Sequence, residues 1–113
     1  FKPGTDDLRS SPAIEGIKIL QQKGAKISAY DPKITPELIS EFGITNIVIH
    51  KKLEECLMNS VLAILFTKWP EFKDISSDFL SRYMVQPLII DGRGYLDKNN
   101  FKKNTYYKVG YVE

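Results

Sequence analysis

The sequence predicts an α/β fold, a three-layer sandwich in which helices cover both faces of a mostly parallel sheet. Short apolar or β-branched runs alternate along the chain with helical patterns, and this alternation is typical of βαβ units. The runs at 60–66 and 85–91 are almost continuously apolar, as in strands that are covered on both faces. With 113 residues, the chain is expected to form one domain, residues 1–113.

The N-terminal half carries clear helix boundaries. Ser11 is the candidate N-cap of a first helix that extends to Lys23, and Gly24 suits the position after its end. Thr35 is the candidate N-cap of a second helix over 35–42, with Pro36 at its first position and Gly43 after its end. The other elements expected in this half are a strand at 25–31, a strand at 47–49 and a helix at 52–59.

The C-terminal half is expected to continue the alternation. Its predicted elements are a strand at 60–66, one helix over 70–83, a strand at 85–91, a turn at 92–94 and a final strand at 105–112. Lys108 and Gly110 interrupt the final strand, which indicates an edge position. The helix beginning at Ser11 also needs a preceding strand. We expect that strand to end near Phe1, mostly upstream of this sequence, in a longer chain.

Composition excludes several classes of protein. The formal net charge of +2 does not by itself favour a nucleic-acid partner. The single cysteine, Cys56, allows no internal disulfide and fits a reducing compartment. No apolar run is long enough for a membrane span, and no signal peptide is recognised, so no membrane partner is expected.

A ligand site is expected where the parallel strands end. Ligands of open parallel sheets bind beyond the carboxyl ends of the strands. The loops at this edge are 1–9, 31–32, 67–69 and 91–93, and they carry the cations Lys2, Arg9, Lys68 and Arg93. Cations near helix N-termini are typical of an anion site, and phosphate is the usual ligand. The chain has neither G-x-G-x-x-G nor G-x-x-x-x-G-K-S/T, so it carries no complete dinucleotide site.

Each candidate also has a structural interpretation. Arg93 lies between two glycines, which allow a ligand or another backbone segment to approach closely. Two interpretations stay open: Arg93 binds a ligand, or it belongs to a simple turn. Asp91 at a strand end more often caps a turn than contacts a ligand. The adjacent Asp6 and Asp7 resemble a catalytic pair, although loop aspartates usually accept backbone N–H bonds.

The remaining candidates favour structure over chemistry. Trp69 before Pro70 fits a packed helix start, and His50 has no second ligand nearby for a metal. Cys56 is expected to be a buried, inert thiol, because nothing near it in sequence would lower its pKa. The basic region formed by Lys98, Lys102, Lys103 and Lys108 is most simply a solvated surface.

Four motifs resemble those of one enzyme family. They are F-K-P-G-T-D-D-L-R-S-S-P at 1–12, A-Y-D-P at 29–32, T-K-W-P-E-F at 67–72 and D-G-R at 91–93. Together they resemble the C-terminal, UDP-binding domain of the UDP-glucose/GDP-mannose dehydrogenase family, in family order and across essentially the whole chain. The resemblance implies a Rossmann-like domain of a longer enzyme with an N-terminal NAD-binding domain and a central dimerisation region.

The resemblance also implies roles for particular residues. Phe1, Lys2 and Arg93 fall at positions that contact the nucleotide sugar, and Arg9 falls where an arginine reaches NAD. The family oxidises the sugar 6-hydroxyl to a carboxylate in two NAD-dependent steps on a catalytic Cys. That Cys lies upstream of this sequence, and Cys56 does not match it. This chain alone is therefore expected to be inactive.

Within the family, the motifs are most like those of UDP-glucose 6-dehydrogenases, which convert UDP-glucose and two NAD+ to UDP-glucuronate. GDP-mannose and UDP-N-acetylhexosamine dehydrogenases remain open, as does a non-catalytic nucleotide-binding module. Lys68 replaces the usual Glu, which puts a role for the 67–69 loop in doubt. Ser10 also replaces a usual Glu, which is expected to weaken the entry into the first helix slightly. The implied parent is a cytoplasmic, homodimeric enzyme of polysaccharide biosynthesis, with no nucleic-acid partner.

Overall fold

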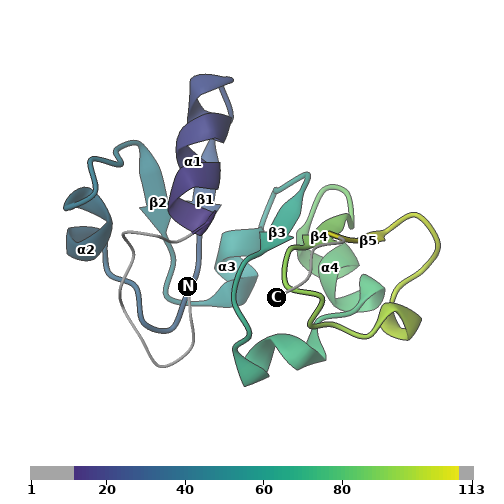
Figure 1. The fold of residues 1–113 in the computed structure, drawn as a ribbon. Helices are drawn as coiled ribbons and strands as arrows, with labels where there is room; N and C mark the ends of the chain where they lie inside the picture. The colour runs from purple at the N-terminus through teal and green to yellow at the C-terminus, as the bar shows by residue number, and fades with distance from the viewer. Residues whose placement is uncertain (1–11, 110–113) are drawn as a thin grey trace. The chain divides into compact units, whose positions relative to one another are not determined.

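The computed structural model describes residues 12–109, which form two compact units divided between Cys56 and Leu57. Figure 1 shows the helices and strands of each unit. Unit 1 holds the described residues up to Cys56, and unit 2 those from Leu57. The expectations for Ser11 and for residues 110–112 lie outside the described residues.

Unit 1 is built from two parallel strands and the helices around them. β1 (Ile27–Ala29) pairs in parallel with β2 (Ile47–Ile49), with Ile27 opposite Ile47. The helices are α1 (Pro12–Gln22), α2 (Pro36–Ser40) and α3 (Leu53–Leu57), whose last residue begins unit 2. The buried apolar residues of unit 1 are Ala13, Ile14, Ile17, Ile34, Ile39 and Ile44.

The predicted caps at Gly24 and Thr35 are confirmed, whereas α2 ends at Ser40 instead of 42 and α3 covers 53–57 instead of 52–59. Gly24 follows α1 with a φ of 89°, a left-handed conformation that glycine adopts without strain. Thr35 is the N-cap of α2, and its Oγ1 accepts a hydrogen bond from the Leu38 N–H at 3.2 Å. Gly43 follows α2 with a φ of 75°.

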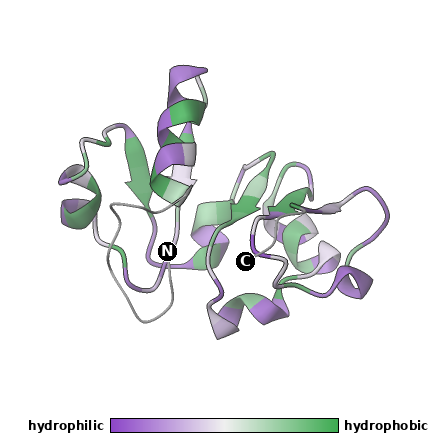
Figure 2. Ribbon diagram, viewed as in Figure 1, coloured by the Kyte–Doolittle hydropathy of each residue, from purple (hydrophilic) through white to green (hydrophobic). Residues whose placement is uncertain are grey.

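Unit 2 contains a three-stranded parallel sheet in the order β3-β4-β5. The strands are β3 (Ala63–Leu65), β4 (Ile89–Asp91) and β5 (Tyr106–Lys108), so the predicted edge position of the final strand is confirmed. The helices are η1 (Pro70–Asp74), α4 (Ser77–Tyr83) and η2 (Lys98–Asn100). Apolar residues concentrate along β3 and β4 (Figure 2). The buried apolar residues of unit 2 are Leu57, Leu65, Phe72, Ile75, Leu80, Met84, Ile89 and Leu96.

The prediction of one helix over 70–83 is wrong. η1 ends at Asp74, and Ile75 is extended, with a ψ of 131°. Ser76 then caps α4, its Oγ accepting a hydrogen bond from the Phe79 N–H at 3.1 Å. A serine that competes for backbone N–H groups favours a helix start over a helix interior. The break also turns Ile75 into the core, where it is 5% exposed.

The strands are shorter than the apolar runs that predicted them. Only three residues of each run make ladder pairs, and Val85 at the start of the run before β4 is 69% exposed. All three strand pairings are parallel, and helices connect the strands. The predicted α/β fold is therefore confirmed.

Candidate anion-binding site after β3 and β4

The candidate site of unit 2 lies where β3 and β4 end. The two strands are parallel neighbours, with Leu65 opposite Asp91, so the segments that follow them leave the sheet at the same edge. The 91–96 loop consists of Asp91, the last residue of β4, and the five residues that follow it.

Asp91 folds the 91–96 loop around its side chain. Its carboxylate is completely buried and accepts four hydrogen bonds. Oδ1 accepts from the Arg93 N–H at 3.0 Å, and Oδ2 accepts from the Tyr95 and Leu96 N–H groups, both at 2.8 Å. The Tyr106 hydroxyl donates to Oδ2 at 2.7 Å. The interpretation of Asp91 as a turn-capping residue is confirmed, and the carboxylate has no exposed surface for a ligand.

Gly92 is required by the backbone of β3. Its N–H donates to the Leu65 carbonyl at 2.8 Å. A Cβ at this position would lie 2.8 Å from the same carbonyl oxygen, closer than a carbon can approach without a backbone shift. Gly94 has a φ of 60°, which disfavours other residue types. The two glycines therefore let the loop turn tightly against β3.

Arg93 lies between these glycines and reaches the segment after β3. Its side chain is half-buried, and Nη1 lies 3.4 Å from the Phe66 carbonyl, to which it donates. Thr67 is buried, whereas Lys68 and Trp69 are half-buried. The structure thus brings the 91–93 segment against Leu65 and Phe66, directly before residues 67–69. A guanidinium is a planar, permanently charged donor group, and its geometry suits the oxygens of a carboxylate or a phosphate.

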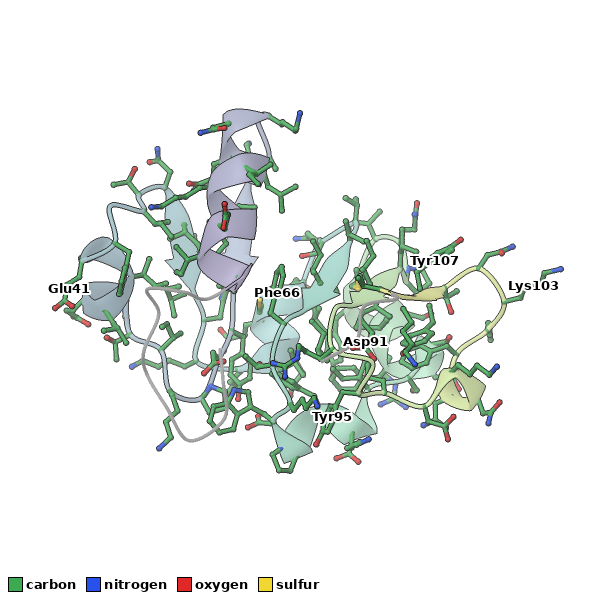
Figure 3. All side chains as sticks on the ribbon, viewed as in Figure 1. Glu41, Phe66, Asp91, Tyr95, Lys103 and Tyr107 are labelled. Carbon is green, nitrogen blue, oxygen red and sulfur yellow. The ribbon has the colours of Figure 1, made fainter. Side chains whose placement is uncertain are left out.

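Two residues that sequence reasoning did not select also hold the 91–96 loop. Tyr106 donates to Asp91, and its ring stacks on Phe101 with centroids 4.8 Å apart. Burial, followed by the hydrogen bond and the negative charge of Asp91, raises the pKa of the Tyr106 hydroxyl. Lys73 of η1 donates to the Tyr95 carbonyl, and its ammonium lies 4.0 Å from the centre of the Tyr95 ring. Figure 3 shows Asp91 inside unit 2 and Tyr107 and Lys103 at its periphery.

The other predicted site residues are not among the described residues of unit 2. Asp31 belongs to unit 1, where its buried carboxylate accepts from the Lys33 N–H at 2.9 Å. Phe1, Lys2 and Arg9 lie outside the described residues, as do Asp6 and Asp7. Their roles stay predictions.

The residues expected to be structural are so placed. Trp69 is the N-cap residue of η1, ahead of Pro70. The His50 N–H donates to the Ala29 carbonyl at 2.9 Å, extending the strand pairing. Cys56 is half-buried instead of fully buried as expected. Its burial still raises the pKa of the thiol to about 11, as expected for an unreactive cysteine.

Among residues 12–109, no cluster of three or more His, Cys, Asp or Glu side chains could hold a metal ion. No helix there has the length and apolarity needed to cross a membrane.

Curated relatives match the whole chain but extend well beyond it. UDP-glucose 6-dehydrogenase TuaD of Bacillus subtilis is 34% identical over 99% of this chain and 23% of its own length. UDP-glucose 6-dehydrogenase of Rickettsia prowazekii is 34% identical over 97% of this chain and 26% of its own length. The chain thus spans about a quarter of the relatives that it matches.

Solved structures of related enzymes share the fold. The UDP-D-ManNAc dehydrogenase of Pyrococcus horikoshii superposes with a TM-score of 0.73 at 25% identity, over 97% of this chain and 23% of that one. The UDP-N-acetyl-mannosamine dehydrogenase Cap5O of Staphylococcus aureus has a TM-score of 0.70 at 23% identity, over 95% of this chain and 23% of that one. Residues 1–98 match the profile of the UDP-binding domain of UDP-glucose/GDP-mannose dehydrogenases. With the fold, the buried D-G-R turn and these matches in agreement, the chain belongs to the UDP-glucose/GDP-mannose dehydrogenase family, as its UDP-binding domain.

Proposed function

We propose that this chain binds the UDP part of a nucleotide sugar within a longer UDP-glucose 6-dehydrogenase. The observation that carries the proposal is the placement of Arg93. A buried carboxylate and two glycines fix its backbone, and its side chain reaches across the ends of two parallel strands. A guanidinium at such an edge binds a phosphate oxygen through two parallel N–H donors.

The proposal gives Arg93 two partners from the start of the chain. Phe1 and Lys2 would contact the nucleotide sugar together with Arg93, and Arg9 would contact NAD. These three assignments rest on the resemblance of the F-K-P-G-T-D-D-L-R motif, since residues 1–11 are outside the described part of the chain.

The proposed reaction takes place in the longer enzyme. Oxidation of the sugar's primary alcohol to a carboxylate would transfer two hydrides to two NAD+, take up one water that supplies the second oxygen, and release three protons. The chain supplies no glycine-rich dinucleotide motif, so the main NAD site would lie in another domain. Cys56, with its pKa raised to about 11, is a poor nucleophile at neutral pH. This chain alone would therefore bind substrate without oxidising it.

The proposed longer chain also completes the sheet of unit 1. β2 is the one strand that pairs with β1 among residues 12–109. A parallel strand that leads into α1 would give the right-handed crossover that βαβ units adopt. We therefore propose that a strand ahead of α1 belongs to this domain. A cytoplasmic homodimer is part of the same proposal and rests on the family resemblance.

A related substrate is the second candidate. The solved structures with the same fold are UDP-N-acetyl-mannosamine dehydrogenases, whereas the curated relatives quoted above are UDP-glucose 6-dehydrogenases. The identity of 34% to the latter, against 25% and 23%, favours UDP-glucose. GDP-mannose would require a purine in place of uracil at the same site. Kinetics of the longer protein with the three nucleotide sugars would distinguish these substrates.

A UDP titration of this chain, followed by backbone-amide NMR, tests the binding proposal. We expect shifts that cluster in the 91–96 loop and in residues 66–69, and that are lost in Arg93→Ala. Arg82→Ala is the matched control, because Arg82 is an exposed arginine in the last turn of α4. A titration of the wild-type chain without saturable shifts would contradict the proposal.

A second experiment tests the expected lack of catalysis. The chain is mixed with UDP-glucose and NAD+, and the absorbance of NADH is followed. No NADH should form above the rate without protein. Sustained NADH formation would show that this chain contains its own catalytic group.

A further inference from the structure

β5 directs alternate side chains toward the 91–96 loop. Side chains two residues apart on a strand lie on the same face. Tyr106 uses this face to reach Asp91, and Lys108 is the next residue on it. Tyr107, on the opposite face, is 50% exposed. The register also pairs Lys108 with Asp91, at the end of the sheet where the loop begins.

The Lys108 side chain passes over Gly94. A Cβ built on Gly94 would lie 2.8 Å from Cε of Lys108 and 3.5 Å from Nζ. The lysine therefore occupies the space that any larger residue at position 94 would fill. Because Gly94 follows Arg93 directly, the ammonium of Lys108 lies against the 91–96 loop one residue after Arg93, whose guanidinium reaches the Phe66 carbonyl.

The charges around Lys108 leave its ammonium available. No hydrogen bond or ion pair described for residues 12–109 uses Lys108 Nζ. The Asp91 carboxylate is buried and already accepts four hydrogen bonds. Asp97 is exposed, and its carboxylate accepts from the Asn99 N–H at 2.9 Å. In contrast, Lys73 is bound to the Tyr95 carbonyl, and Lys102 lies 3.9 Å from Asp78.

We propose that Lys108 is a second anion-binding residue of the Arg93 site and contacts the diphosphate of the ligand. The inference rests on the proposed function and adds to it a residue from β5. The two cations have complementary properties: arginine is a planar fork for two oxygens, and lysine is a mobile point charge. A diphosphate offers oxygens to both, which favours UDP over a nucleoside without phosphates.

The test compares UDP affinity in three lysine variants by the same NMR titration. Lys108→Gln should weaken UDP binding about three- to fivefold, the effect of one exposed ion pair. Lys108→Arg keeps the charge and should bind nearly as well as the wild type. Lys103→Gln is the matched control, because Lys103 is exposed and lies before β5, at the other end of the strand. It should leave the affinity unchanged.

Salt provides a second readout. Added NaCl screens an exposed ion pair, so the difference between the wild type and Lys108→Gln should shrink as the salt concentration rises. If Lys108→Gln binds UDP like the wild type while Arg93→Ala does not, the inference about Lys108 is overturned and the proposed function stands. If the wild-type chain does not bind UDP, both are overturned.

Discussion

The Asp91 carboxylate collects four donors from two different segments, three backbone N–H groups of its own loop and the hydroxyl of Tyr106. A buried carboxylate with fewer donors would be costly, because burial disfavours its charge. The Tyr106 hydroxyl is therefore as much a part of the turn as the backbone N–H groups. The contribution of the Tyr106 hydroxyl to stability can be measured with a substitution that removes only this group.

Removal of the Tyr106 hydroxyl should destabilise unit 2. Tyr106→Phe keeps the ring on Phe101 and deletes the donor to Asp91. The expected loss is about 1.5 kcal/mol in the free energy of unfolding, typical of a hydrogen bond to a charged group. Tyr107→Phe is the control, since Tyr107 is half exposed, and it should change stability by less than about 0.5 kcal/mol. Equal thermal midpoints for the two variants would contradict this role.

Cys56 should react slowly with alkylating reagents in the folded chain. Its pKa is raised by burial from 9.0 to about 11, and the thiolate is the reactive form. At pH 8 the folded chain should react about a hundredfold more slowly with iodoacetamide than the chain in denaturant. The single cysteine makes the assay unambiguous. If the alkylation rate of the folded chain rose with an apparent pKa near 9, the thiol would not be shielded and the prediction would be wrong.

The same shift predicts alkaline destabilisation. Because the folded pKa of Cys56 lies above the unfolded value, its stabilising contribution is complete below pH 9 and is lost as the pH rises toward 11. The raised pKa of Tyr106 acts in the same direction at high pH. Cys56→Ser should reduce the fall of the thermal midpoint between pH 9 and 11. If the thermal midpoint of this variant fell with pH as steeply as that of the wild type, the thiol would not be the source of the alkaline destabilisation.

α4 and the loop before β5 are joined by a small polar network. Ser77, the first residue of α4, is 3% exposed, and its Oγ accepts from the Lys102 N–H at 2.6 Å. The Thr105 hydroxyl donates its hydrogen to the Lys102 carbonyl at 2.6 Å. In the 2.9 Å hydrogen bond between the hydroxyls of Ser77 and Thr105, Ser77 is therefore the donor. The network fixes the entry into β5, the strand that carries Tyr106.

Ser77→Ala should cost more than an ordinary serine substitution on α4. It leaves the Lys102 N–H without this buried acceptor, and we expect a loss of about 2 kcal/mol in urea unfolding. Ser81→Ala on the exposed side of the same helix is the matched control and should be neutral or slightly stabilising. Similar urea midpoints would mean that the network contributes nothing.

The elements show which local signals predict structure. Thr35, Pro36 and the glycines at 24 and 43 act within one helical turn, so the sequence predicted these boundaries. The sequence did not predict the break between η1 and α4, because a serine at position 76 is compatible with a helix interior as well as with an N-cap. The strand ends were missed because pairing, rather than the apolar run, determines where a ladder stops.

At the scale of the whole chain, the local features of the candidate site could be predicted from the sequence, whereas its long-range contacts could not. The position of Arg93 in a turn after a buried strand could be predicted, because the glycines on both sides and the preceding apolar run are visible in the sequence. The contacts of Tyr106 with Asp91 and of Lys108 with Gly94 could not be predicted, since they depend on the parallel register of β5 with β4. A tyrosine fifteen residues from Asp91 carries no local sign of that contact.

UDP should stabilise the whole chain against heat. Ligand that binds only the folded state adds about 1.4 kcal/mol at ten times its Kd, which corresponds to several degrees for a chain of this size. The rise in thermal midpoint should be absent in Arg93→Ala and retained in Arg82→Ala. The same rise in both variants would place the UDP site away from the 91–96 loop.

The bond between Tyr106 and Asp91 also sets an order of events during synthesis. The ribosome makes Asp91 fifteen residues before Tyr106, and the loop lacks its fourth donor until β5 has emerged and paired. A nascent chain halted between η2 and β5 would hold the arginine without the strand that supports its turn. The turn that positions Arg93, the proposed nucleotide-binding residue, is thus complete only after β5 has paired, and a product that stops before β5 should bind nucleotide weakly even where its helices have formed.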